Sequence, residues 1–193
     1  METQTPSLPP YVPPVGCPST SVQIPDNQAF RLKSSRFTNL WLSSTSGSRP
    51  GETNIISTYD ISAATIFTAT PGNTGQVSLL SDANDNTPRD SQFFPYYGNN
   101  LGVLYFLANA ARSWGITQLC LQPENTFTVY SEGADGPTTN DPNLAVVCPP
   151  NINIPSYVYL MNGDTSVQSN RDNVDYFVSE GCQADVLVYD PIV

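Results

Sequence analysis

Three stretches of this sequence repeat one pattern, and that repetition constrains the fold more than any other feature. Each stretch is an aromatic, strand-like run, then a turn that contains glycine, then a second apolar run, which is the pattern of a β-hairpin. The three stretches are Ile66–Gly72 with Gln76–Leu80, Phe127–Gly133 with Leu144–Cys148, and Tyr176–Gly181 with Asp185–Tyr189. The last two share the turn sequence Ser-Glu-Gly. The sequence therefore predicts an all-β protein built from repeats.

A further pair of strand-like runs precedes each hairpin and completes a four-strand unit. These runs are 30–34 and 40–42, then 103–107 and 117–121, then 157–161 with a weaker stretch around Val167. The result is about twelve strands in three units, with a period of roughly 50 to 60 residues. Val103–Ala111 could also form a short helix, but it has no N-cap residue in front of it, and its first half suits a buried strand.

The pattern resembles the β-trefoil, a six-stranded barrel closed at one end by three hairpins, over about residues 28–193. The Q-x-W repeat of ricin-type lectins is missing. An antiparallel β-sandwich with a similar number of strands is the alternative. Residues 1–27 are rich in proline and threonine, and the proline-dense part should be extended and lie outside the sheet. Residues 81–100 form a long insertion between the first and second units.

Four cysteines are dispersed along the chain, at Cys17, Cys120, Cys148 and Cys182. There is no C-x-x-C pair and no histidine, so a zinc site is not expected. An even number of dispersed cysteines in an acidic chain rich in serine and threonine indicates two disulfides and an oxidising compartment. Three pairings are open. The β-trefoil resemblance implies Cys17–Cys182 and Cys120–Cys148, because the first and last strands of a trefoil are neighbours.

The charge balance argues against nucleic acid as a partner, and none is expected. Seven basic residues stand against 17 acidic ones, for a net charge of −10, and so few cations cannot neutralise a run of phosphates. Only Arg31, Lys33 and Arg36 cluster, and strand alternation places Arg31 and Lys33 on one solvated face. No run of about 18 apolar residues exists, so no membrane span is expected. The first residues lack a signal peptide, and we interpret the chain as the mature form of an extracellular protein.

An aromatic and amide cluster is the best candidate for a ligand site. It consists of Tyr96, Tyr97, Asn99 and Asn100 in the insertion, with Trp114 on a later turn. Aromatic faces stack on the C–H groups of sugars, and amides bond to hydroxyls. Packing of the insertion against the barrel is the alternative interpretation of the same residues.

Metal binding and catalysis find little support in the sequence. Asp82-x-Asn84-x-Asn86 resembles the start of a calcium loop, but Thr87 replaces the required glycine and Phe93 the required glutamate. The absence of histidine excludes His-dependent triads. No pair of carboxylates stands out as the acid and base of a glycosidase. We expect no metal, no cofactor and no enzymatic activity.

The whole profile resembles that of small fungal secreted surface proteins, such as the conidial cell-wall proteins. The shared features are a Thr/Pro-led head before Gly16-Cys17-Pro18, an acidic body without histidine, two disulfides and polar loops. The resemblance implies a structural or masking role at the spore or hyphal wall, with wall polysaccharide or host proteins as partners. The alternatives are a β-trefoil protease inhibitor, with Gly133–Asn143 or the insertion as reactive segment, and a glycan-active enzyme.

Overall fold

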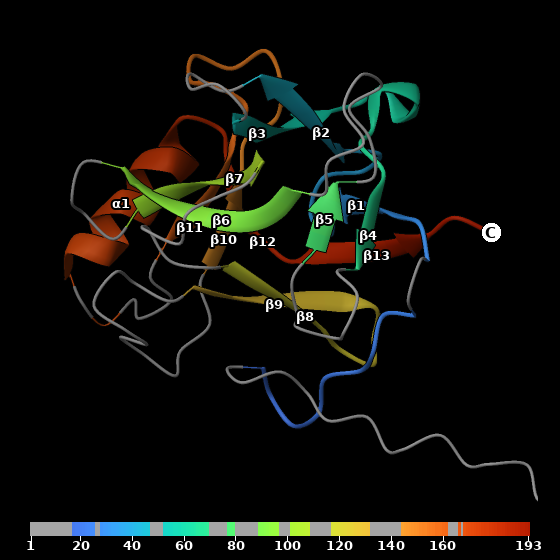
Figure 1. Ribbon diagram of the computed structural model, residues 1–193. Coiled ribbons are helices and arrows are strands. Elements are labelled where there is room, and N and C mark those ends of the chain that lie inside the picture. The colour runs from blue at the N-terminus through green and yellow to red at the C-terminus, as the bar shows by residue number, and fades with distance from the viewer. Residues whose placement is uncertain are drawn as a thin grey trace, which may run out of the picture.

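The computed structural model is a mainly antiparallel β protein with one α-helix (Figure 1). It describes residues 17–25, 28–46, 52–69, 77–79, 89–96, 101–108, 117–131, 144–161, 166 and 168–193. The strands of these residues are β1 (Phe30–Ser34), β2 (Trp41–Ser46), β3 (Glu52–Thr58), β4 (Phe67–Ala69), β5 (Val77–Leu79), β6 (Arg89–Tyr96), β7 (Leu101–Ala108), β8 (Thr117–Leu121), β9 (Thr126–Ser131), β10 (Leu144–Val147), β11 (Val158–Met161), β12 (Gln183–Asp185) and β13 (Leu187–Pro191). A short 3-10 helix, η1 (Ile61–Ala63), and the helix α1 (Gln168–Ser179) complete the elements. The predicted all-β class is confirmed.

The strand pairings form a closed ring with two extensions. Starting from β1, the ring runs through β2, β3, β7, β6, β5 and β4 and returns to β1. One extension leaves β1 through β13, β9 and β8. The other leaves β7 through β11, β10 and β12. Three hairpins, β2–β3, β6–β7 and β10–β11, also pair with each other. Strand β3 pairs with β7, β7 pairs with β11, and Ile56 of β3 forms a bridge with Tyr157, directly before β11.

One of the three predicted hairpins is present in the structure, and the other two are not. The first is confirmed, because β4 and β5 pair with Phe67 opposite Leu79. The second is wrong: β9 and β10 both exist, but β9 pairs with β8 and β13, whereas β10 pairs with β11 and β12. The third is also wrong, because Tyr176–Ser179 forms the end of α1. The predicted 81–100 insertion contains the strand β6, which pairs with β7 along its whole length. The predicted unit boundaries therefore do not hold.

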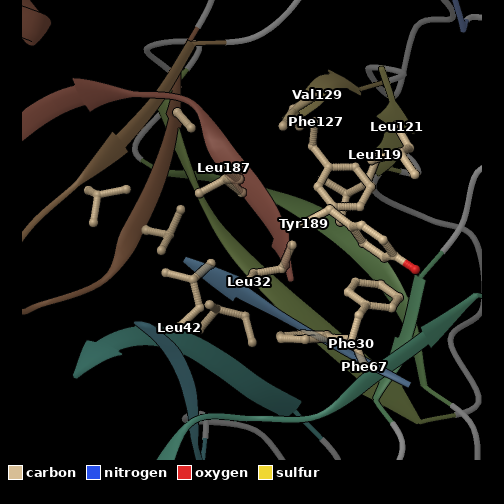
Figure 2. Packing of buried hydrophobic residues seen from close by; sticks show 14 of the residues in the cluster. Phe30, Leu32, Leu42, Phe67, Leu119, Leu121, Phe127, Val129, Leu187 and Tyr189 are labelled. Atoms are coloured by element: carbon tan, nitrogen blue, oxygen red, sulfur yellow. The ribbon is translucent and has the colours of Figure 1, made fainter. Parts of the chain in front are cut away.

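The main core lies between the strands and is built from alternating side chains. In β1 the inward residues Phe30, Leu32 and Ser34 are buried, while the two residues between them are half-buried. Apolar side chains from β1, β2, β3, β4, β8, β9, β10, β11 and β13 meet in one cluster, and Figure 2 shows them converging. Burial of this kind stabilises the fold by about 25 cal/mol for each Å² of apolar surface removed from water.

Four aromatic rings form the centre of this cluster. The ring of Phe30 lies 5.9 Å from Phe67, 6.0 Å from Phe127 and 5.0 Å from Tyr189, measured between centroids. Figure 2 shows the four rings gathered from β1, β4, β9 and β13. Burial raises the pKa of the Tyr189 phenol above its ordinary value of 10.0. The neutral phenol therefore favours folding at neutral pH, and this contribution is lost as the pH rises through the folded-state pKa.

The helix α1 covers β10 and β11 with a second, smaller core (Figure 1). Phe177 and the half-buried Val174 face Tyr159, whose ring centroid lies 4.4 Å from that of Phe177. The helix ends at Ser179, and Gly181 two residues later has a φ of 99°. There the amide of Gly181 donates to the carbonyl of Val178, and the amide of Cys182 donates to that of Phe177. These two hydrogen bonds form the Schellman motif, which requires a residue with left-handed backbone angles, usually glycine.

The two predicted disulfides are present, but the implied pairing is wrong. Cys17 is bonded to Cys120, and Cys148 is bonded to Cys182. Cys148 follows β10 and Cys182 precedes β12, and these strands pair with Val147 opposite Gln183. The next pair along the ladder is therefore the two cysteines, with Cα atoms 4.1 Å apart. That distance is short enough for a direct bond.

Residues 17–25 form an N-terminal strap along β8 (Figure 1). The backbone amide of Val22 donates a hydrogen bond of 2.8 Å to the carbonyl of Leu121. The side-chain amide of Gln122 donates to the hydroxyl of Ser21. Ile24 is buried in the main core. The strap therefore belongs to the folded domain, although it lies within the predicted N-terminal segment 1–27.

Candidate binding surface

The predicted aromatic and amide cluster lies largely outside the described residues. Tyr96 is the last residue of β6, where its backbone pairs with Leu101. Tyr97, Asn99, Asn100 and Trp114 fall outside the described part of the chain. Their proposed role in sugar binding stays a prediction.

The structure brings a different group of polar and aromatic side chains together on the outer face of β1. We define the β1 surface as Arg31, Lys33, Trp41 and Asp190, which come from β1, β2 and β13. The Lys33 ammonium lies 3.3 Å from the Asp190 carboxylate and 5.3 Å from the centroid of the Trp41 ring. Arg31 and Lys33 share one half-buried face, as the alternation predicts. The result is an indole ring beside a hydrogen-bond donor and an acceptor.

Sequence reasoning missed Trp41, although a signal was present. Leu40 and Leu42 on either side are fully buried, whereas Trp41 is half-buried. In a strand, neighbouring side chains point to opposite faces. The sequence Leu-Trp-Leu therefore places the indole on the outside once both leucines are assigned to the core.

A buried carboxylate supports the turn at the end of β1. Asp185 is 5% exposed, and its oxygens accept hydrogen bonds from the Ser34 hydroxyl, from the amide and hydroxyl of Ser35 at 2.9 and 2.7 Å, and from the amide of Val186. The Ser34 oxygen in turn accepts from the amides of Arg36 and Phe37. Asp185 thus fixes the turn that leads from the β1 surface into β2.

Asp185→Ala is expected to lower the free energy of unfolding by about 3 kcal/mol, because it leaves the buried Ser34 and the Ser35 amide without their acceptor. Urea denaturation monitored by fluorescence measures the change. The control is Asp190→Ala, which breaks a part-exposed ion pair and should cost about 1 kcal/mol or less. Equal losses in the two variants would contradict a supporting role for Asp185.

Two further acidic residues, Asp60 and Glu124, are exposed. Hydrogen bonds from the hydroxyl and amide of Ser62 hold the pKa of the exposed Asp60 below its ordinary value of 3.8. The ionised carboxylate caps η1, and this local stabilisation is lost as the pH falls through the lowered pKa. Glu124 lies exposed in the turn between β8 and β9. Within the described ranges, no group of three or more cysteine and acidic residues could hold a metal ion.

Comparison of the chain with protein-family models, with curated proteins and with solved structures found no match. No helix in the described part of the chain is long and apolar enough to cross a membrane. The β1 surface is therefore interpreted from its own chemistry.

Proposed function

We propose that this chain is a secreted, non-enzymatic surface protein of a fungal cell wall, with a structural or masking role and affinity for wall polysaccharide. Two disulfides support the extracellular assignment: one bonds the N-terminal strap to β8, and the other joins β10 to β12. Such bonds persist in oxidising compartments. The fungal wall itself rests on the compositional resemblance described above.

The β1 surface carries the binding part of the proposal. Trp41 is half-buried and so partly exposed to solvent, although its two neighbours in sequence, Leu40 and Leu42, are fully buried in the core. Aromatic rings of this kind bind the apolar C–H faces of sugars, and neighbouring charged groups bond to hydroxyls. Lys33 supplies donors and Asp190 an acceptor beside the ring. These three groups fit a hydroxylated ring lying along the outside of β1.

We also propose that the strands form a β-trefoil, with repeats that differ from those in the sequence analysis. The proposed units are β1 to β4, β5 to β8, and β9, β10, β11 with β13. Five of the six neighbour pairs of such a barrel support the assignment, namely β1–β4, β4–β5, β8–β9, β9–β13 and β13–β1. The sixth, β5–β8, has no pairing among the described residues.

The hairpins and the sequence pattern agree with this division. The hairpins β2–β3, β6–β7 and β10–β11 each fall in the middle of one proposed unit. The first strand of each unit carries the same apolar–polar–apolar alternation, in Phe30-Arg31-Leu32, Val77-Ser78-Leu79 and Phe127-Thr128-Val129. Alternation of this kind places one face of each strand toward the barrel interior.

Retention on purified wall glucan and chitin tests the proposed binding. Trp41→Ala should weaken retention about 10-fold, which corresponds to the loss of about 1.4 kcal/mol of binding free energy. Tyr59→Ala is the control, because Tyr59 is an aromatic residue that is 52% exposed outside the β1 surface. Absence of retention on every wall fraction would contradict the binding. An equal loss in both variants would contradict the assignment to the β1 surface.

A further inference from the structure

Three of the seven basic residues of this acidic chain lie within six consecutive positions of the sequence. Arg31 and Lys33 lie on the outer face of β1, and Arg36 is exposed in the turn that follows. The chain as a whole carries a net charge of −10. Charges further than about 8 Å apart are largely screened at physiological ionic strength, so a ligand at the β1 surface responds mainly to the groups around it.

Two described carboxylates close to β1, those of Asp185 and Asp190, are bound to groups other than the arginines. Asp190 lies opposite Arg31 in the β1–β13 ladder, but its carboxylate contacts Lys33. Asp185 accepts its hydrogen bonds from serines and backbone amides.

As a result, neither Arg31 nor Arg36 forms a salt bridge within the described ranges. The Nε of Arg31 is buried and has no hydrogen-bond partner among the described residues. A buried donor without a partner costs about 1 to 3 kcal/mol. Among the described residues, two guanidinium groups thus have no acidic partner, in a chain that has an excess of acids.

We propose that the β1 surface and Arg36 bind an acidic polysaccharide, one whose sugar units carry carboxylates. A guanidinium is a planar fork that binds a carboxylate through two parallel hydrogen bonds. The indole of Trp41 lies beside the same face and suits the apolar side of the sugar ring. A uronic-acid unit presents both features within one ring. This inference rests on the proposed function and specifies the class of polysaccharide.

Polygalacturonate and its fully methyl-esterified form provide a matched pair of probes, because they share the sugar ring and differ in charge. Isothermal titration should show at least about 10-fold tighter binding of the acid form, as expected for one charge-assisted hydrogen-bonded pair. Binding of the acid form should also weaken as salt is raised from low to physiological concentration, whereas binding of the ester should change little.

The double variant Arg31→Gln/Arg36→Gln should lose the preference for the acid form and keep its binding of the ester. The control is Arg171→Gln, which removes one positive charge from α1 and should leave the preference unchanged. Thermal melting of each variant verifies that the fold is intact. Because Gln keeps two methylene groups of the arginine stem and an uncharged hydrogen-bonding end, both variants should melt close to the unaltered protein.

The outcomes separate this inference from the proposed function. Equal binding of the acid and the ester overturns the inference, while retention on glucan or chitin would leave the proposed function standing. A loss of preference in Arg171→Gln as large as in the double variant overturns the location. Binding of neither polygalacturonate nor its methyl ester, with no retention on glucan or chitin, overturns both proposals.

Discussion

Replacing Cys148 and Cys182 together by alanine is expected to lower the free energy of unfolding by about 4 kcal/mol. The disulfide closes a loop with a sequence separation of 34, and opening such a loop restores about this much chain entropy to the unfolded state. Both cysteines are almost fully buried, so alanine leaves no new polar group without a partner. Urea denaturation of the double variant and of the unaltered protein gives the difference.

The same variant should also loosen α1. The bond joins Cys182, the last residue of the Schellman motif, to Cys148 directly after β10, in the same small core as Phe177 and Tyr159. In the double variant, hydrogen exchange of the α1 amides should therefore accelerate relative to the unaltered protein, and by more than that of the β1 amides. Val178→Ala, on an exposed position of the same helix, is the control and should change neither measurement appreciably. Unchanged stability in the double cysteine variant would contradict this role of the disulfide.

Phe30→Ala is expected to destabilise the protein by about 4 kcal/mol, in the range of large-to-small aromatic substitutions in cores. Phe30 is fully buried, and its ring contacts three other aromatic rings from three strands. The cavity would open where β1, β4, β9 and β13 meet, so the surrounding side chains cannot close it without moving several strands. Chemical denaturation measures the loss.

Two further variants distinguish the loss of core packing from a general loss of stability on replacing an aromatic residue. Phe30→Leu keeps most of the volume and should cost about 1 kcal/mol, and the exposed Tyr59→Ala should cost still less. If Phe30→Ala were no more damaging than Tyr59→Ala, the four-ring cluster would not be the centre of the core.

Strands with a clear alternation could be predicted from the sequence. The ranges expected for the strands at 30–34 and 117–121 agree with β1 and β8. In β1 the buried Phe30, Leu32 and Ser34 alternate with half-buried residues, and this period of two is a local property of the sequence. The outward placement of Arg31 and Lys33 follows from the same rule. In β8 the consecutive residues Leu119, Cys120 and Leu121 are all buried, so its apolar content rather than an alternation marks it as a strand.

The helix α1 could not be distinguished from a strand by local sequence alone. Tyr176-Phe177-Val178 consists of residues that favour strands, and Ser-Glu-Gly suits a hairpin turn as well as a helix end. The choice depends on tertiary contacts, since Phe177 packs on Tyr159 and the Cys182 bond holds the chain beyond the Schellman turn.

The sequence analysis predicts neither β3 nor β6. Because these two strands are missing from it, the predicted repeats have the wrong boundaries and the implied disulfide pairing is wrong. β3 is Glu-Thr-Asn-Ile-Ile-Ser-Thr, which is mostly polar, and β6 contains Pro95, which usually argues against a strand interior. Without these two strands the hairpins were assigned to the wrong positions in each unit. Cys148, directly after β10, and Cys182, directly before β12, then could not be recognised as opposite neighbours.

The candidate surface depends on contacts between distant parts of the chain. Lys33 and Asp190 are 157 residues apart, and Ser34 and Asp185 are 151 apart. No local pattern connects either pair, because their contact exists only after β1 pairs with β13. Individual residues of the surface could be predicted to be exposed, but their grouping required the fold.

The most direct test of an extracellular, disulfide-bonded β domain is the oxidation state of its cysteines in the protein isolated from its natural source. Alkylation before and after reduction, followed by peptide mass spectrometry, reports each cysteine separately. We expect no alkylation before reduction, and cross-linked peptides that join Cys17 to Cys120 and Cys148 to Cys182. Free, alkylated thiols at all four positions of the unreduced protein would contradict the extracellular assignment and the function proposed from it.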